Sequence, residues 1–111
     1  MGAKNIRRLL MGNTSSVTQL TSKATGVSIS TTSGQITTDD AQLNTGTEVV
    51  FTVTNAEVKA TGVIALSIKS GGTSGSYIAA VGAVADGSFD IVLANVGSTL
   101  GQAVVINFVV L

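Results

Sequence analysis

The sequence predicts an all-β protein: a compact β-sandwich or small barrel of about eight short antiparallel strands, preceded by an extended N-terminal arm. Short runs of Val, Ile, Thr and Phe alternate with polar residues, a pattern typical of strands with one buried face. Clusters of Gly, Ser, Asn and Asp separate these runs at intervals of roughly ten residues. No 3.6-residue apolar period is sustained over a helix length, and the chain contains no proline.

Charge divides the chain into a basic N-terminal arm, residues 1–16, and a β domain, residues 17–111. The arm holds three of the six cations, so the β domain keeps three cations and six carboxylates, a net charge of −3. One apolar triplet in the arm, made of Ile6, Leu9 and Leu10, has the spacing of a single helical turn. The side chains that we expect to contact a partner are Lys4, Arg7, Arg8, Leu9 and Leu10.

The first three strands of the β domain are expected at 17–20, 27–30 and 35–38. The sequence TTSG, which joins the second of these to the third, indicates a loop. We expect Gly34 in this loop to supply a positive φ at no steric cost.

The central strands are more strongly patterned. The segment 48–54, EVVFTVT, alternates in polarity and places Phe51 on its buried face. An exposed connection, NAEVKATG, follows at 55–62. The next strand, 63–69, is expected to turn three side chains inward, namely Ile64, Leu66 and Ile68.

A glycine-rich loop, SGGTSGS at 70–76, leads to a strand at 77–84. Asp86 and Gly87 form the residue pair preferred in a type I′ hairpin turn. The strand after this turn, 88–95, is expected to bury one face, which consists of Phe89, Ile91 and Leu93.

The closing strand, AVVINFVVL at 103–111, is apolar on both faces. One face consists of Val104, Ile106, Phe108 and Val110, and the other consists of Val105, Asn107, Val109 and Leu111. A two-layer sandwich leaves the outer face of each sheet in water, so the second set requires a partner beyond its own sheet. We expect a second copy of the chain to cover it. A central place in a closed barrel, or capping by the arm, is the alternative.

The composition lacks the residues on which most enzyme mechanisms depend. Cys and His are both absent, so the chain has no thiolate, no imidazole base and lacks the commonest transition-metal ligands. A Ser–Lys dyad would need a desolvated lysine, and no sequence context predicts one among Lys23, Lys59 and Lys69.

Two pairs of carboxylates remain, Asp39 with Asp40 and Asp86 with Asp90. Both pairs occupy turn-like positions, where solvated carboxylates are common. We therefore expect no enzyme activity, no catalytic residue, no metal site and no cofactor.

The overall composition predicts that the partners of this chain are other proteins. Charged residues make up only 11% of the chain and apolar residues 44%, which is unusual for a free monomer. The charge-free run 91–111 is interrupted by Asn and Gly, so we expect no membrane segment, and the first residues lack the apolar run of a secretory signal. Nucleic acid is not the expected partner, because three cations form a small electrostatic footprint.

A series of short motifs runs through the β domain in the order TSKATGVSIS, SGQITT, EVVFTVTNAEVKAT, SGGTSGSY, DGSFDIVLANV and VVINFVV. In this order the chain resembles small virion proteins of tailed bacteriophages, of the capsid decoration (cement) or head-fibre type. The stretch 80–83 is less polar than that resemblance leads us to expect.

The resemblance implies a β-rich homotrimer at the three-fold positions of a capsid lattice, where it binds the major capsid protein and stabilises the shell. It implies a protein made in the bacterial cytoplasm and located on the capsid surface of the virion, with the arm residues named above contacting the capsid. The alternative is a tail-fibre or head-fibre tip that binds a host surface glycan through the loops 55–62 and 70–76. One Tyr and no Trp disfavour this alternative.

Overall fold

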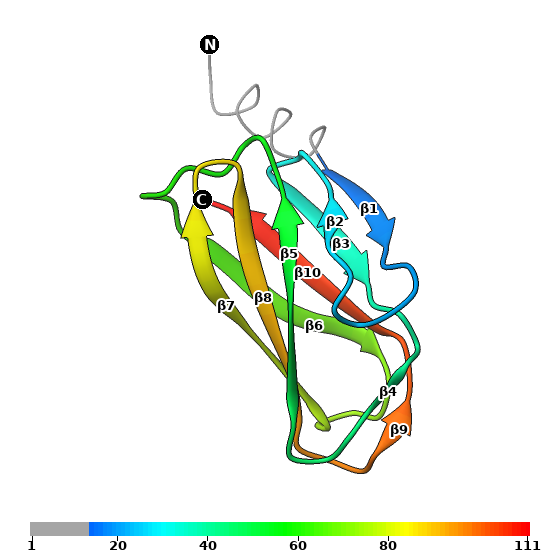
Figure 1. Cartoon of the computed structure of the whole chain (residues 1–111). Coiled ribbons are helices and arrows are strands. Elements are labelled where there is room, and N and C mark those ends of the chain that lie inside the picture. The colour runs from blue at the N-terminus through cyan, green and yellow to red at the C-terminus, as the bar shows by residue number, and fades with distance from the viewer. Residues whose placement is uncertain (1–13) are drawn as a thin grey trace.

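The computed structural model describes residues 14–111, which form an all-β sandwich (Figure 1). Sheet A has the strand order β1-β3-β10-β6 and sheet B the order β2-β5-β8-β7, while β4 and β9 pair as a short ribbon. The bounds are β1 Thr14–Thr18, β2 Val27–Ser28, β3 Ser33–Thr37, β4 Gln42–Leu43, β5 Glu48–Thr54, β6 Ile64–Gly71, β7 Tyr77–Ala85, β8 Ser88–Asn95, β9 Leu100–Gly101 and β10 Val104–Val110.

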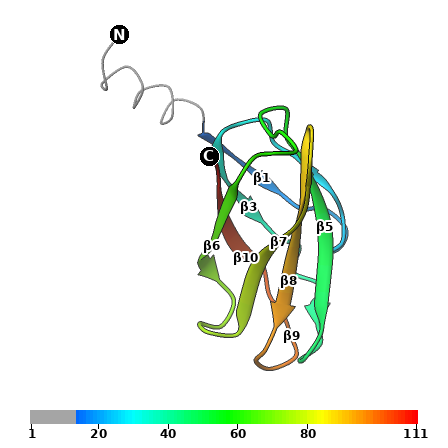
Figure 2. The ribbon, with the colours of Figure 1, turned by 90° about the vertical axis from the view of Figure 1, so that its left-hand side faces the viewer.

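The two four-stranded sheets face each other, and Figure 2 shows them from the side where β6 and β7 lie next to each other. These two strands are edge strands, one of each sheet. By contrast, β10 is an interior strand of sheet A and runs antiparallel to both of its neighbours, β3 and β6. The closing strand is thus a central element of an open sheet and not part of a closed barrel.

The predicted all-β sandwich is confirmed, and each of the eight predicted strands overlaps a strand of the structure. The expectation of antiparallel strands holds for most pairs, but β1 pairs with β3, and β2 with β5, in parallel. The first three residues of β1, Thr14 to Ser16, lie inside the segment that we assigned to the arm. The two-residue strands β4 and β9 were not predicted.

The core lies between the sheets and is built from the inward positions of the alternating strands. Phe51 of β5, Phe89 of β8 and Phe108 of β10 are almost fully buried, as predicted from their place in the alternation. The rings of Phe89 and Phe108 pack across the two sheets with centroids 5.8 Å apart. Burial of such rings supplies a large share of the apolar area that stabilises a domain of this size.

The connection 55–62 is not simply exposed, as we expected. Val58 is completely buried and closes one end of the core. Asn55 is buried too, and its amide nitrogen donates to the carbonyl of Thr31 (2.8 Å) while its amide oxygen accepts from the Glu57 nitrogen (2.8 Å). A single apolar residue in a polar loop has no periodicity, so pattern analysis cannot identify it as core.

Gly34 is a strand residue of β3 and does not have the positive φ that we expected. A Cβ atom at this position would lie 2.8 Å from the Ser15 carbonyl oxygen, 2.9 Å from the Phe108 ring and 3.0 Å from Ile29. Glycine is therefore required here by the close approach of β1 and β10, not by backbone conformation.

The predicted hairpin between β7 and β8 is present, but its turn is not of type I′. Gly87 has a φ of 82°, whereas Thr21 is the one non-glycine residue with a positive φ in the described part of the chain. Asp86 therefore lacks the left-handed conformation that a type I′ turn requires at both central positions.

Both edge strands that flank the open side of the sandwich are irregular. The register of β7 against β8 shifts between Val81 and Val84, and that of β6 against β10 shifts next to the pair of Ile68 and Ile106. Ile68 points inward as predicted, but it remains 36% exposed because the sandwich is open between β6 and β7. Such bulges bend an edge and reduce its capacity to pair with another strand.

Candidate interaction surfaces

The outer face of β10 carries the side chains that we predicted as an oligomer interface. Val105 and Asn107 are half-buried, Val109 is 36% exposed and Leu111 is 75% exposed. Their backbone positions are fixed by the register on both sides of β10, so these side chains form a row along the middle of sheet A. The apolar character of this face is therefore directed to solvent in the described structure.

The neighbours of this row on β3 are polar but uncharged. Asn107 pairs in register with Gln35 of β3 and Ser67 of β6, and its amide nitrogen donates to the Ser67 hydroxyl over 3.2 Å. The other outward positions of β1 and β3 are Thr14, Ser16, Thr18, Ser33 and Thr37. No carboxylate or ammonium therefore interrupts the outer face of β1, β3 and β10, and little charge has to be desolvated when a partner covers it.

The upper end of sheet A carries an apolar strip, which we define as Val63, Ala65, Val109 and Leu111. Val109 pairs with Ala65, and the Leu111 backbone nitrogen donates to the Val63 carbonyl oxygen over 2.8 Å. Val63 is 61% exposed. Neighbouring positions of adjacent strands point to the same side, so the four side chains form one contiguous surface.

The outer face of sheet B has a second apolar patch, which was not predicted. The register aligns Val50 of β5, Val92 of β8 and Ala80 of β7 across three strands, and it places Ile78 beside Ala94 in the next row. Val50 and Ile78 are exposed. The sequence alternation indicates this patch, because Val50 and Ile78 are apolar residues at positions that alternate with the buried side chains of their strands.

The arm residues that we predicted to contact a partner, Lys4, Arg7, Arg8, Leu9 and Leu10, lie outside the described residues. The described chain from Thr14 onward keeps three cations, Lys23, Lys59 and Lys69, and all six carboxylates.

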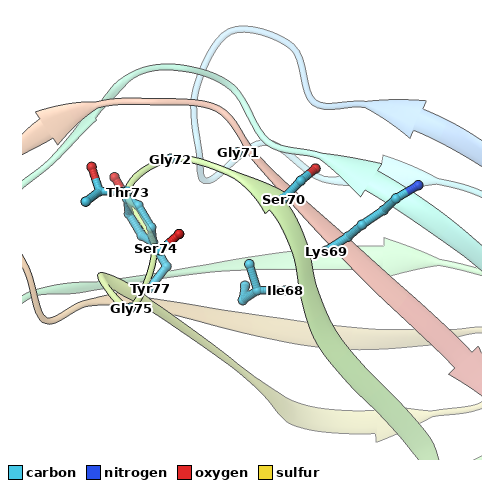
Figure 3. A pocket seen from close by; sticks show the side chains of 9 residues that line it. All are labelled: Ile68, Lys69, Ser70, Gly71, Gly72, Thr73, Ser74, Gly75 and Tyr77. Carbon is cyan, nitrogen blue, oxygen red and sulfur yellow. The ribbon is translucent and has the colours of Figure 1, made fainter.

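The loop between β6 and β7 borders an open hollow of about 490 Å³. Gly71, Gly72 and Gly75 all have positive φ, which accounts for the glycine-rich sequence of this loop. Figure 3 shows the loop curling over the ring of Tyr77, while the Lys69 side chain extends away from it. Lys69 is the one charged residue among those that line the hollow.

The single tyrosine is not available as a sugar-binding platform. Tyr77 is buried, and its hydroxyl donates to the Gln102 amide oxygen over 2.9 Å. The two loops of the glycan hypothesis also lie at opposite ends of the sandwich. The loop 55–62 follows Thr54, which pairs with Ser88 at the start of β8, and the loop 70–76 precedes Tyr77, which pairs with Asn95 at the end of β8. The length of β8 separates them by about 24 Å, so they cannot form one contact.

Lys23 is the one lysine of the described chain that is buried, and we did not predict this. It is 4% exposed, and its ammonium donates to the backbone carbonyls of Asp39, Ala41 (2.6 Å) and Gln102 (2.7 Å). Burial lowers the pKa of Lys23, and the nearby Asp39 and Asp40 carboxylates oppose this effect in part. All three acceptors are main-chain carbonyls, so the ammonium joins three segments and activates no hydroxyl.

Gln19 completes this polar cluster. Its amide nitrogen donates to the carbonyls of Lys23 (2.8 Å) and Thr25 (2.9 Å), and its amide oxygen accepts from the Asp39 nitrogen (3.0 Å). At the other end of the chain Asn95 has a similar role, with its amide nitrogen bonded to the carbonyls of Leu43 (2.7 Å) and Ser98 (2.8 Å). These side chains form hydrogen bonds with backbone groups in the long connections, which lack regular secondary structure.

Three of the four candidate carboxylates accept hydrogen bonds that support local structure. The Asp39 carboxylate accepts from the Ala41 nitrogen over 2.8 Å, and the Asp86 carboxylate accepts from the Ala60 nitrogen over 2.8 Å. Asp90 accepts from the Thr52 hydroxyl on the outer face of sheet B (2.7 Å). Among residues 14–111 no group of three Asp, Glu, His or Cys side chains gathers as metal ligands would, and none of these residues belongs to a helix long and apolar enough to span a membrane.

Comparison of the chain with protein-family models, with curated proteins and with solved structures returned no match.

Proposed function

We propose that the protein is a structural component of a bacteriophage virion, a capsid decoration protein that binds the outer capsid surface as a homotrimer and stabilises the shell. The observation that carries this proposal is the uncharged, partly apolar outer face of β1, β3 and β10 in sheet A, centred on Val105, Asn107, Val109 and Leu111. Contiguous apolar surface that is exposed to water is typical of sites that contact another protein.

The described structure supports this function in a second respect. Buried polar side chains tie the long connections of the sandwich, and no buried side-chain nitrogen or oxygen of the described residues lacks a hydrogen-bond partner. A subunit that reinforces a shell must keep its own shape while load is transferred through it, and satisfied buried networks restrict motion. The sequence resemblance to decoration proteins supplies the biological setting.

Stabilisation of a shell by such a protein is additive over the lattice. A standard interface of about 1,600 Å², repeated at each three-fold position, must be broken before the shell ruptures. The arm is basic, whereas the β domain is acidic. We assign the arm to a contact with the major capsid protein.

The test uses purified protein and expanded capsids that lack it. We expect saturable binding with a fixed ratio of protein to capsid subunits, together with an increase in the temperature at which the shells rupture. A matched variant, Lys4→Ala/Arg7→Ala/Arg8→Ala, should bind with reduced affinity and a weaker dependence on salt. Absence of binding by the unmodified protein would refute the proposal.

The glycan-binding alternative has weaker support, since Tyr77 is buried and the two loops are far apart. A signal on a glycan array that is lost on substitution of Thr73 or Ser74, both at the hollow beside the β6–β7 loop, would favour it over capsid decoration.

A further inference from the structure

The outer face of sheet B carries an apolar patch with a carboxylate at each end. We define the sheet B patch by the apolar side chains that the register of β5, β8 and β7 brings together, namely Val50, Ile78, Ala80, Val92 and Ala94. Glu48 pairs with Ala94 at one end of the patch, and Asp90 lies two residues before Val92 at the other end. The face is therefore apolar in its middle and negative at both ends.

An open hollow of about 370 Å³ extends the patch at the Glu48 end. Its walls include Glu48 at the start of β5 and Ala94 and Val96 at the end of β8. Val96 is 58% exposed, and the exposed Glu48 carboxylate forms no hydrogen bond or ion pair with another of residues 14–111. A long side chain that enters this hollow therefore meets a free carboxylate beside an apolar surface.

The charge of this face excludes a second copy bound through the same face. β5, β7 and β8 contain neither Lys nor Arg; Lys23 is buried, and the two exposed lysines, Lys59 and Lys69, lie outside sheet B. Two copies joined face to face here would bring both Glu48 and both Asp90 carboxylates together without a cation, and like charges at an interface oppose association. The charge instead matches a different protein that supplies the cations.

We propose that the sheet B patch binds the major capsid protein, through a segment in which apolar side chains stand next to Lys or Arg. This inference rests on the capsid-decoration function proposed above and assigns the face that meets the shell. The apolar side chains of the segment cover Val50 and Val92, and its cations meet Glu48 in the hollow and Asp90 at the opposite end. Lys and Arg suit both places, because their stems pack on apolar surface while their charged ends reach the carboxylates.

Gly82 of β7 keeps the Asp90 end of the patch open. A Cβ atom at Gly82 would lie 3.2 Å from the Asp90 Cβ and 3.5 Å from a Val92 methyl group. Glycine at this position therefore leaves both side chains accessible from the β7 side. One Asp90 carboxylate oxygen accepts from the Thr52 hydroxyl (2.7 Å), so the second oxygen is available to a cation of the partner.

The face is small for an independent complex. Two strand spacings of about 4.8 Å and six residue rises of about 3.4 Å give it a width of roughly 10 Å and a length of roughly 20 Å. A standard interface buries about 800 Å² on each partner, which is several times this footprint. A single contact of this kind is therefore weak, and it holds the protein on a shell when one oligomer makes several of them at once.

The test compares two charge reversals in the full-length protein, with expanded capsids that lack it as the probe. Glu48→Lys places a cation at the hollow, whereas Glu57→Lys makes the same change of charge at an exposed carboxylate beyond the other end of β5. A third variant, Val50→Ser, removes apolar surface from the patch without a change of charge. Circular dichroism and light scattering first establish that all three keep the β spectrum and the oligomeric state of the parent protein.

We expect Glu48→Lys to bind capsids at least about tenfold more weakly than the parent, because its cation faces a cation of the shell, and Glu57→Lys to bind within about twofold of the parent. Val50→Ser should also bind more weakly, but with the salt dependence of the parent, since it removes no charge. Equal binding by the Glu48 and Glu57 variants, or parent affinity in Val50→Ser, would overturn this inference and leave capsid decoration in place. A parent protein that binds no capsid would overturn both.

Discussion

Replacement of Lys23 by Met tests whether the buried ammonium holds the connections of the sandwich together. Met retains most of the packing of the lysine stem and removes the donor. Three carbonyls, those of Asp39, Ala41 and Gln102, then lose their partner. An acceptor without a partner costs about 1–3 kcal/mol when it is buried. All three residues are only partly buried, so water reaches them and the lower end of this range applies, which gives a total loss of about 3 kcal/mol in the free energy of unfolding.

The measurement is urea and thermal unfolding followed by circular dichroism, at one protein concentration because the proposed self-association would add to stability. For a domain of this length, a loss of about 3 kcal/mol lowers the melting temperature by roughly 12–24 °C. The control is Lys59→Met, an exposed lysine whose ammonium makes no hydrogen bond in the described structure, and we expect a change within about 0.5 kcal/mol. Equal stability of the two variants would refute the structural role of Lys23.

The remaining predictions concern association, packing, a buried amide and pH. Val105→Asp places a charge on the outer face of sheet A and should convert the proposed trimers to monomers at micromolar concentration in light scattering, whereas Val50→Asp on sheet B should not; trimers that persist would show that the wrong face was assigned. Gly34→Ala should lower the free energy of unfolding by about 1–3 kcal/mol in urea, because its Cβ has no space, and an unchanged midpoint would contradict this reason. Asn95→Ala should cost about 2–4 kcal/mol by the same assay, since two carbonyls lose their donor, and a cost below that of an exposed Asn would be inconsistent. Burial lowers the pKa of Lys23 from 10.5, so in the window just below that value the unfolded chain binds more protons, and the stability of the parent protein should rise with pH relative to Lys23→Met; a fall would reverse the sign.

The strands that pattern analysis located best are the long ones with one buried face. β5 and β8 begin and end at the predicted residues, because a period of two over seven or eight residues has no other interpretation. β4 and β9 contain two residues each, which is too short for any period to show. The parallel pairing of β1 with β3 and of β2 with β5 could not be predicted either. Alternation is the same in parallel and antiparallel strands, and only the route of the chain through the fold decides the orientation.

Single buried residues in polar surroundings were missed for a related reason. Val58, Asn55 and Lys23 are each buried by contacts that are distant in sequence, and neighbouring residues carry no trace of those contacts. Gly34 was correctly singled out but given the wrong cause, because a glycine required for close packing and one required for positive φ look alike in a sequence.

For the candidate surface, the sequence located the outer row of β10 correctly, because both faces of this strand are apolar. The apolar strip was only half visible, since Val63 and Ala65 join Val109 and Leu111 through strand pairing. The patch on sheet B was overlooked, although Val50 and Ile78 stand out of phase in their strands.

The register shifts in β6 and β7 affect whether copies of the chain aggregate at high concentration. A straight free edge invites an incoming strand, and repeated additions of that kind lead to fibres. The shifted register around Gly82 and Ala83 breaks the row of free main-chain groups along β7, so a visiting strand finds no continuous ladder to extend. The register shift therefore disfavours edge-to-edge pairing of copies through β7 and leaves the outer faces of the two sheets as the surfaces for contact.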